Sequence, residues 1–309
     1  MGELHQLIIR HGKQKAQELL GDVDRRILDT AADFLADEDC EIGVTFSGFC
    51  LVSLPHRRLD VNEIWVRNGN RVSLTLEPGT IPGTKRKVGV PYGAKARMML
   101  LYLQGEAIRN NSPEVELGPS MHAWMRRMGV SLGGKSYHDL RDQMRRISLC
   151  HLTFSYEDDG RVEFTKDPIV KAGSVEAFDN TNPEQGRLWQ ETLRLGDTFY
   201  DMLKKHPVPL LESAIRALSS QSQALDIYIW LAYRLHVLER DTAISWEKLL
   251  AQFGAGYSRT RDFKRRFCLS LQQALAVYPE AEVKVTRGGI VLSPSAPPVP
   301  ERSLLVARG

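Results

Sequence analysis

The residues of this 309-residue chain that are best suited to recognising another molecule form one basic stretch near its C-terminal end. Between residues 259 and 266 there are five basic side chains and one acidic side chain, Asp262. Arg pairs through two hydrogen bonds with guanine or with a phosphate, and Gln pairs in the same way with adenine. The stretch therefore has the chemistry needed to contact duplex DNA.

A helix over residues 258–278 would divide this stretch into two faces. At 100° per residue, five of its apolar side chains fall within one arc, which we expect to pack on a core. These side chains are Phe263, Phe267, Leu271, Ala274 and Tyr278. The side chains predicted to face DNA are Arg259, Arg261, Lys264, Arg265, Arg266 and Gln272, with Gln273 on the same arc. Leu269 also points outward, where it would contact either the preceding domain or a thymine methyl group.

The elements around this helix predict a winged helix, in which a third helix enters the major groove and a β-hairpin follows it. The three helices are expected at residues 223–238, 246–253 and 259–277. Ser245 is expected to cap the second helix. A tight turn at Arg287-Gly288-Gly289 is expected to close a hairpin over 281–292, from which Lys284 and Arg287 would reach a phosphate backbone or the minor groove. The alternative interpretation of the third helix is a solvated basic face.

The first half of the chain predicts the same order of elements. Helices are expected at residues 93–111, 120–128 and 137–149, after strands at 41–54 and 65–76 and before a hairpin at 151–165. Ser136 is expected to cap the third helix. Its predicted DNA-facing side chains are Lys135, His138, Arg141 and Arg145. The alternative is a surface helix whose Arg and Asp side chains pair locally.

A basic loop and the composition complete the expected organisation. Lys85, Arg86 and Lys87 follow a Pro- and Gly-rich turn and are further candidates for phosphate contact. The predicted fold class is α+β, with two winged-helix domains in tandem and a helical N-terminal extension. The predicted parts are the extension at 1–40, a first winged-helix-like domain at 41–196, a second, DNA-binding domain at 197–295, and a flexible Pro-rich tail at 296–309.

Several classes of protein are not expected. The net charge of +3 is only mildly basic, and the 42% hydrophobic content is that of an ordinary globular protein. Cys40, Cys50, Cys150 and Cys268 form no CxxC pair, so we expect buried thiols in a reducing cytoplasm and neither a metal nor a cofactor. The apolar run Leu7-Ile8-Ile9 is too short for a signal peptide or a membrane span.

An enzyme is not expected either. Cleavage of DNA would need paired carboxylates or a His cluster that holds a metal, and such residues are isolated here. Gly133-Gly134-Lys135-Ser136 lacks the earlier glycine of a phosphate-binding loop. Asp158-Asp159-Gly160 is interpreted as a hairpin turn.

Short motifs in a fixed order give the chain a family resemblance. In the first half they are Leu54-Pro55-His56-Arg57, Val88-Gly89-Val90-Pro91-Tyr92-Gly93, Leu101-Tyr102-Leu103-Gln104 and Glu116-Leu117-Gly118-Pro119-Ser120. In the second half they are Val208-Pro209-Leu210, Ala224-Leu225-Asp226-Ile227-Tyr228, Trp230-Leu231-Ala232-Tyr233-Arg234-Leu235, Gln252-Phe253-Gly254-Ala255, Val277-Tyr278-Pro279 and Leu292-Ser293-Pro294-Ser295. As a set, from about residue 40 to 295, they resemble the RepA-type plasmid replication initiators of bacteria, whose members carry tandem winged-helix-like regions.

The resemblance implies a function beyond DNA binding. It implies a bacterial cytoplasmic protein that binds repeated duplex sites (iterons) at a plasmid origin and promotes local strand opening. It also implies recruitment of the host initiator and replicative helicase, and a homodimer that represses the protein's own promoter. The alternative functions are a tandem winged-helix transcriptional regulator without a replication role, and a protein-interaction scaffold that does not bind DNA.

Overall fold

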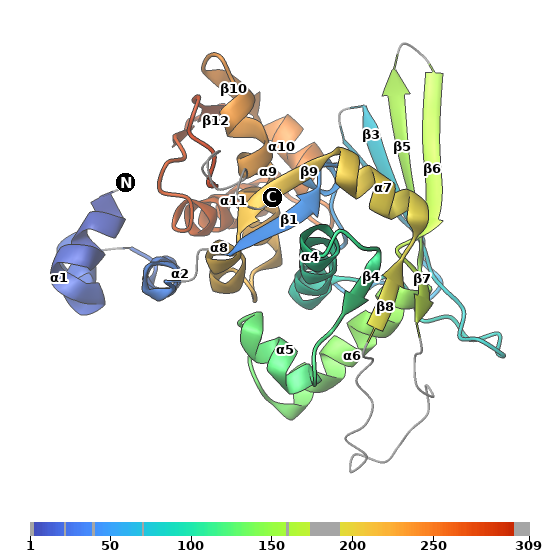
Figure 1. The fold of residues 1–309 in the computed structure, drawn as a ribbon. Coiled ribbons are helices and arrows are strands. Elements are labelled where there is room, and N and C mark those ends of the chain that lie inside the picture. Colours follow the sequence, from blue (N-terminus) through green and yellow to red (C-terminus); the bar gives the residue numbers. More distant parts are fainter. Residues whose placement is uncertain are drawn as a thin grey trace. The chain divides into compact units, whose positions relative to one another are not determined.

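The chain folds into two compact units in a computed structural model that describes residues 3–21, 23–38, 41–69, 71–158, 161–173 and 192–299 (Figure 1). Unit 1 combines Met1–Gly43 with Val208–Gly309, and unit 2 is Val44–Pro207. The chain passes between the units in strands β1 (Ile42–Phe46) and β9 (Pro207–Leu211), which form a two-stranded sheet. Helix and strand are mixed in both units, as the predicted α+β class requires.

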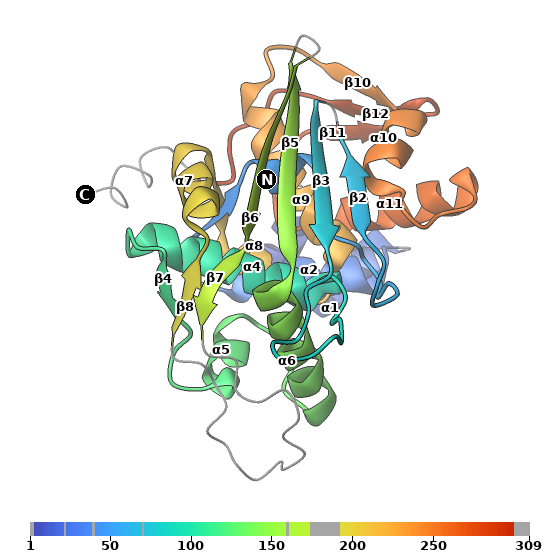
Figure 2. The ribbon, with the colours of Figure 1, turned by 90° about the vertical axis from the view of Figure 1, so that its right-hand side faces the viewer.

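Unit 2 contains an antiparallel sheet of four strands in the order β2-β3-β5-β6 (Figure 2). The strands are β2 (Trp65–Asn68), β3 (Val72–Glu77), β5 (His151–Asp158) and β6 (Arg161–Pro168). Leu74 lies opposite Phe154 and Leu76 opposite Leu152, and all four side chains are buried. Strands β2 and β3 pair in a first hairpin, and β5 and β6 pair in a second, which confirms the hairpin predicted over 151–165. Asn70 of the first turn and Asp159 and Gly160 of the second lie outside the described residues.

The helices of unit 2 follow the prediction closely, with two exceptions. The helices are α4 (Gly93–Arg109), α5 (Met121–Arg127), α6 (Gly134–Leu149) and α7 (Asp197–Lys205). Helix α7 is the first exception, because it was not predicted. The strand expected over 41–54 is wrong in its second half, because the single-turn helix α3 (Gly48–Leu51) follows β1. The backbone N–H of Val52 donates to the carbonyl of Gly48 and closes this turn.

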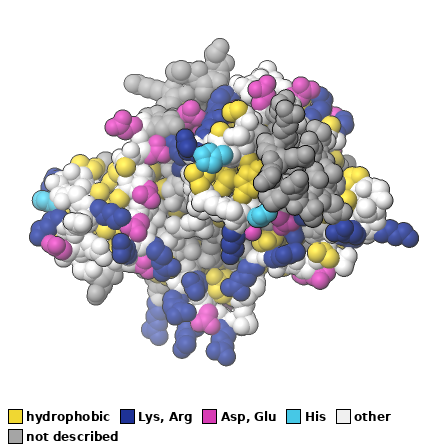
Figure 3. Space-filling model, turned by 90° about the horizontal axis from the view of Figure 1, so that it is seen from below, with side chains coloured by type: hydrophobic (Ala, Val, Ile, Leu, Met, Phe, Trp, Pro, Cys, Tyr) yellow, Lys and Arg dark blue, Asp and Glu magenta, His cyan; other side chains and the backbone are white. Residues whose placement is uncertain are grey.

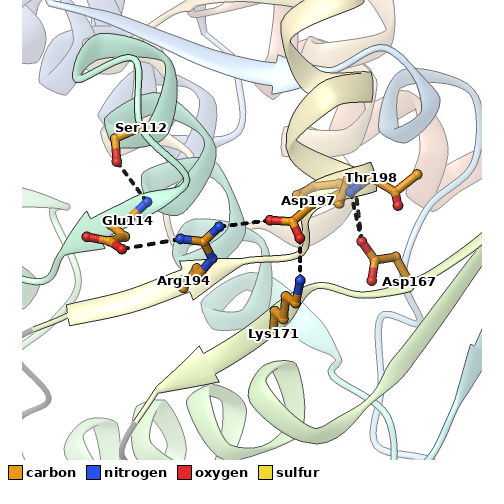
Figure 4. A network of polar contacts seen from close by, with 8 residues as sticks. Ser112, Glu114, Asp167, Lys171, Arg194, Asp197 and Thr198 are labelled. Atoms are coloured by element: carbon orange, nitrogen blue, oxygen red, sulfur yellow. Dashed lines mark hydrogen bonds and ion pairs between the residues drawn. The ribbon is translucent and has the colours of Figure 1, made fainter.

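A second sheet of unit 2, β4-β8-β7, is held by an ion network (Figure 4). Its strands are β4 (Glu114–Glu116), β7 (Val170–Gly173) and β8 (Thr192–Leu195). Arg194 bonds to Glu114 at 3.3 Å and to Asp197 at 3.0 Å. Hydrogen bonds from Lys171 and then from Arg194 lower the pKa of Asp197. Residues 174–191, between β7 and β8, lie outside the described residues.

Two serines of unit 2 provide a matched test of helix capping. The Ser120 hydroxyl accepts a hydrogen bond from the backbone of Ala123 at 3.1 Å and caps α5. Ser136, the predicted cap of α6, lies inside the helix and bonds to Ser131, because α6 begins at Gly134. We expect Ser120→Ala to lower the free energy of unfolding by about 1 kcal/mol. Ser136→Ala should lower it by less than about 0.5 kcal/mol in the same urea titration, and equal losses would contradict the assignment.

The part of unit 1 from residue 222 to 292 contains three α-helices and a three-stranded sheet in the order β10-β12-β11. The elements are α9 (Ser222–Arg234), β10 (Thr242–Ser245), α10 (Trp246–Phe253), α11 (Thr260–Leu275), β11 (Val283–Val285) and β12 (Gly289–Leu292). The predicted helices and the hairpin are present, although the first helix ends at Arg234 and continues as the 3-10 turn η1 (Leu235–Val237). Ser245 caps α10, as predicted. Strand β10 was not predicted.

The N-terminal helices belong to unit 1. They are α1 (Glu3–Leu20), which is kinked at Gly12, and α2 (Arg25–Ala36), and α1 ends just before Gly21, which has a φ of 61°. Helix α2 packs against α8 (Glu212–Ala217) and α11. The predicted parts at 1–40 and 197–295 therefore share one compact unit, except that α7 lies in unit 2. The apolar stripe of α2 needs a partner surface, and α11 and α8 supply it.

The C-terminal segment of unit 1 contacts the end of α11 before the described part of the chain stops at residue 299. The Tyr278 hydroxyl donates to the carbonyl of Ala296 at 2.7 Å and Val299 is buried, while residues 300–309 of the predicted tail lie outside the described part. Cys50 and Cys150 are buried, and burial raises the pKa of the Cys150 thiol to about 12. Cys268 is partly exposed, and Cys40 is not described. None of the helices within the described ranges has both the length and the hydropathy needed to cross a bilayer.

Candidate nucleic-acid interface

Helix α11 has the inner face that its sequence predicts. Phe263 and Phe267 are fully buried, Leu271 and Ala274 are buried one and two turns later, and the helix packs on α9. The ring of Phe267 lies edge-on to that of Trp246, with centroids 6.1 Å apart. This aromatic packing fixes the rotation of α11 about its own axis, and so determines which side chains it presents to solvent.

The fully exposed charged side chains on the first two turns of α11 are all basic. Arg261, Arg265 and Arg266 are exposed, and Arg259 is exposed at the N-cap position. Within the described residues, none of these four guanidinium groups has an ion pair or a hydrogen bond. On the face drawn in Figure 3, Lys and Arg side chains gather at the lower edge, while acidic side chains lie among the basic ones elsewhere. Unpaired guanidinium groups on one helix face are available to bind phosphates or base edges.

Two side chains of α11 differ from the prediction. Lys264 is half-buried, and its ammonium group lies 5.1 Å from the centre of the Trp246 ring, so part of its charge is engaged in a cation–π contact. Gln273 was expected on the outer arc with Gln272, but it is buried and 6% exposed, whereas Gln272 is exposed. The outer arc is therefore open along the first two turns and partly covered farther on.

Trp246 also fixes the hairpin of unit 1. Its indole N–H donates to the carbonyl of Arg287 at 3.2 Å, and its backbone N–H donates to the carbonyl of Gly288 at 3.1 Å. Arg287 at the turn and Lys284 on β11 are both exposed. One tryptophan thus joins the start of α10, the side of α11 and the hairpin turn. Lys264 of α11 and Arg287 of the turn therefore both contact Trp246.

Helix α6 of unit 2 is less open than α11. Lys135 and His138 are exposed, while Arg141 and Arg145 are half-buried. Arg145 pairs with Asp142 at 3.2 Å, and Asp139 pairs with Lys95 of α4 at 2.8 Å. Local pairing was the alternative interpretation of this helix, and it applies to Arg145. Lys135 and His138, in the first turns, are the side chains of this set that are best placed to reach a ligand.

The basic loop at Lys85–Lys87 is an ordered turn. The backbone N–H of Ile81 donates to the carbonyl of Arg86 at 2.9 Å, and that of Val88 donates to Gly79 at 3.1 Å. The hydroxyl of Thr84 accepts from the backbone of Arg86 at 3.1 Å. Lys85, Arg86 and Lys87 are all exposed on this support. An ordered loop holds its charges in place at little entropic cost, which favours binding to a fixed array of phosphates.

Two exposed arginines were not selected from the sequence. Arg57 and Arg58 lie two and three residues after Pro55. Leu54 and Pro55 are buried, and the guanidinium of Arg97 donates to their carbonyls at 2.7 and 3.2 Å. Two adjacent arginines were the signal that the sequence offered. Arg57 entered the prediction only as part of a family motif, and no DNA contact was predicted for it.

Comparison with known proteins places the chain in a family. Residues 90–248, more than half of the chain, match the family of plasmid-encoded RepA proteins. The chain belongs to this family. It is therefore a plasmid replication protein of the initiator type, as the sequence motifs indicated. No curated protein sequence matches the chain.

Two crystal structures of domains 2 and 3 of RctB are similar to this RepA-family chain. In one, the identity is 10%, the match covers 74% of this chain and 84% of that chain, and the TM-score is 0.49. In the other, the identity is 9%, the coverage is 79% and 93%, and the TM-score is 0.48.

The motif at Val88–Gly93, where the RepA-family match begins, encloses a buried arginine. Arg146 of α6 is 2% exposed, donates to Asp142 at 2.7 Å and to the carbonyl of Val90 at 3.1 Å, and stacks over Tyr92. Gly89 has a φ of 71°, and a Cβ there would lie 2.5 Å from the Arg146 guanidinium. Glycine is required at this position both by the backbone conformation and by the guanidinium. Sequence reasoning missed this contact because it joins residues 56 positions apart.

Proposed function

We propose that this RepA-family protein binds repeated duplex sites at a plasmid origin, and that α11 makes the principal contact. The observation that carries the proposal is the row of exposed, unpaired arginines on the first two turns of α11. Such a row suits the major groove, where Arg reads guanine and grips phosphates. The order α9, β10, α10, α11, β11, β12 supports a winged-helix assignment of unit 1, in which α11 would be the recognition helix.

The remaining basic side chains would provide affinity and register. Lys284 and Arg287 would reach a phosphate backbone or the minor groove beside the α11 site. In unit 2, a second winged helix would use Lys135, His138 and Arg141 of α6, with the ordered turn at Lys85–Lys87 on the phosphates. Neutralised phosphates release counterions, so this part of the binding energy should depend strongly on salt.

The later steps of initiation follow from binding at repeats. Adjacent bound copies would bend the origin and lower the cost of opening a neighbouring A·T-rich segment. The opened origin would then receive the host initiator and the replicative helicase. A homodimer would bind the promoter of the gene instead and repress it. The site of action is the bacterial cytoplasm, and the protein would need no catalytic activity of its own.

Binding to the DNA that flanks the gene tests the proposal. The full chain should bind duplexes from this region about 1000-fold more tightly than scrambled duplexes of equal length, measured by fluorescence anisotropy at several salt concentrations. A plasmid that carries the gene and its flanking repeats should replicate, and an internal frameshift should stop replication. Replication despite the frameshift, together with specific binding, would favour a transcriptional regulator. Absence of salt-sensitive binding to any duplex would contradict the proposal.

A further inference from the structure

The N-terminal helices pack on the C-terminal half of α11, within unit 1. Ile27 and Ala31 of α2 and Ala276 at the end of α11 form a buried apolar cluster. Four partly buried side chains pack against this cluster, namely Leu4, Ile8, Val23 and Leu269. The outward position of Leu269 is thereby explained by a protein contact from the N-terminal end of the chain.

A buried hydrogen bond joins α1 to the end of α11. The Nε2 atom of His5 lies 2.8 Å from the carbonyl oxygen of Ala276, and His5 is 3% exposed. Because a carbonyl only accepts hydrogen bonds, Nε2 must carry the proton and donate. The last carbonyls of a helix have no partner within it, so His5 satisfies one that would otherwise be buried without a bond. Helix α1 thus supplies a cap to α11 from 271 positions away.

Helix α2 is also fastened to a second element of unit 1. Arg216 of α8 donates two hydrogen bonds to Asp37, just after α2, at 2.7 and 2.9 Å. The side-chain amide of Gln221 donates to the Thr30 hydroxyl at 3.2 Å. The helix pair is therefore fixed to the body of the unit as well as to α11. This arrangement can resist a tilt of α11.

We propose that α1 and α2 are a positioning element for α11, which holds its C-terminal half and confines DNA contact to its first two turns. The stripe that begins at the exposed Arg265 continues through Leu269 and Gln273 at steps of one turn. Arg265 is exposed, Leu269 is half-buried and Gln273 is buried. The same stripe is thus free at its start and enclosed at its end. This inference rests on the proposed function of α11.

The cluster is small, so one substitution should detach the helix pair. Ile27→Asp in the full chain places a charge in the cluster, and we expect amides of α1, α2 and residues 269–276 to lose hydrogen-exchange protection. Residues 263–267 and α9 should stay protected. A stoichiometric titration gives the fraction of the protein that can bind DNA. The Kd for origin DNA, calculated for this fraction, should rise about 10-fold. The salt slope should stay unchanged, because no phosphate-binding side chain is removed.

Two kinds of control accompany this variant. Ile27→Val should bind like the wild type, and so should Ile9→Asp, since Ile9 is 59% exposed on α1. His5→Leu should weaken binding in the same direction through loss of the bond to Ala276, and His5→Gln, which retains a donor, should restore it. This pair gives a test if Ile27→Asp does not fold.

The outcomes separate this inference from the function on which it rests. An unchanged Kd in both Ile27→Asp and His5→Leu, with protection lost as expected, would overturn the positioning role while origin binding stands. A smaller fraction of protein able to bind, with an unchanged Kd, would overturn the positioning role as well. So would a lower slope of log K against log salt. Failure of the wild type to bind any duplex would instead refute the proposed function, and with it this inference.

Discussion

Replacing both Arg261 and Arg265 by alanine is expected to weaken binding to origin DNA by about 100-fold or more, since each lost arginine contact costs about 1–3 kcal/mol. Both guanidinium groups are exposed on the first two turns of α11, and neither has a partner within the described residues. Anisotropy titrations over a range of salt concentrations give the affinity and its salt dependence together. The slope of log K against log salt should fall by about 0.9 for each phosphate contact that is lost.

A matched arginine of the same unit serves as the control for this prediction. Arg240 is exposed just before β10, at the end of the sheet where Thr242 pairs with Leu292, away from the hairpin turn. Arg240→Ala removes the same charge and should change the affinity by less than about twofold, as expected for a rim charge. An equal loss in the Arg240→Ala variant and in the Arg261→Ala single variant would show that only total charge matters. The placement of α11 in a groove would then be wrong.

Replacing Arg146 by alanine is expected to lower the free energy of unfolding by about 2–5 kcal/mol, because a buried side chain that bonds to the partly buried Asp142 is lost and a cavity remains. The side chain bonds to Asp142 and to the carbonyl of Val90, and it is among the largest side chains that are fully buried. Urea denaturation followed by circular dichroism measures the loss. Arg126→Ala, an exposed arginine of α5, should change stability by less than about 0.5 kcal/mol.

Gly89 tests the same contact from the other side. Gly89→Ala should also destabilise unit 2, because its Cβ would lie 2.5 Å from the Arg146 guanidinium at a positive φ. In the Arg146→Ala background the clash is absent, so the cost of Gly89→Ala should fall to that of the backbone conformation alone. Strict additivity of the two substitutions would contradict the contact.

Local sequence signals predicted the elements that depend on local chemistry. The Ser245 cap of α10 and the hairpin turn beyond Arg287 come from residues close together in sequence, and both are present. The aromatic face of α11 follows from its helical period. Strand β10 is only four residues long, and its pairing with β12 depends on a partner almost 50 positions later, so its own sequence carries little signal.

The errors in the site have the same physical origin. Gln273 and Leu269 lie on the polar arc of an isolated helix, and only tertiary contact decides that one is buried and the other half-buried. Ser136 has the residue type of a cap, but α6 starts two residues earlier at Gly134. The pairing of Arg145 with Asp142 was foreseen as an alternative, because residues three apart on a helix are neighbours.

Recognition of individual base pairs by Arg265 tests the central claim most directly. The wild type and Arg265→Ala would be titrated with one origin repeat and with repeats in which each base pair is replaced in turn. The wild type should lose about 10-fold in affinity at the base pairs that α11 reads. Arg265→Ala should bind the intact repeat more weakly and become insensitive to replacement at one or two of those positions. An unchanged profile of base preference in the variant would contradict the assignment of α11 as the helix that reads DNA.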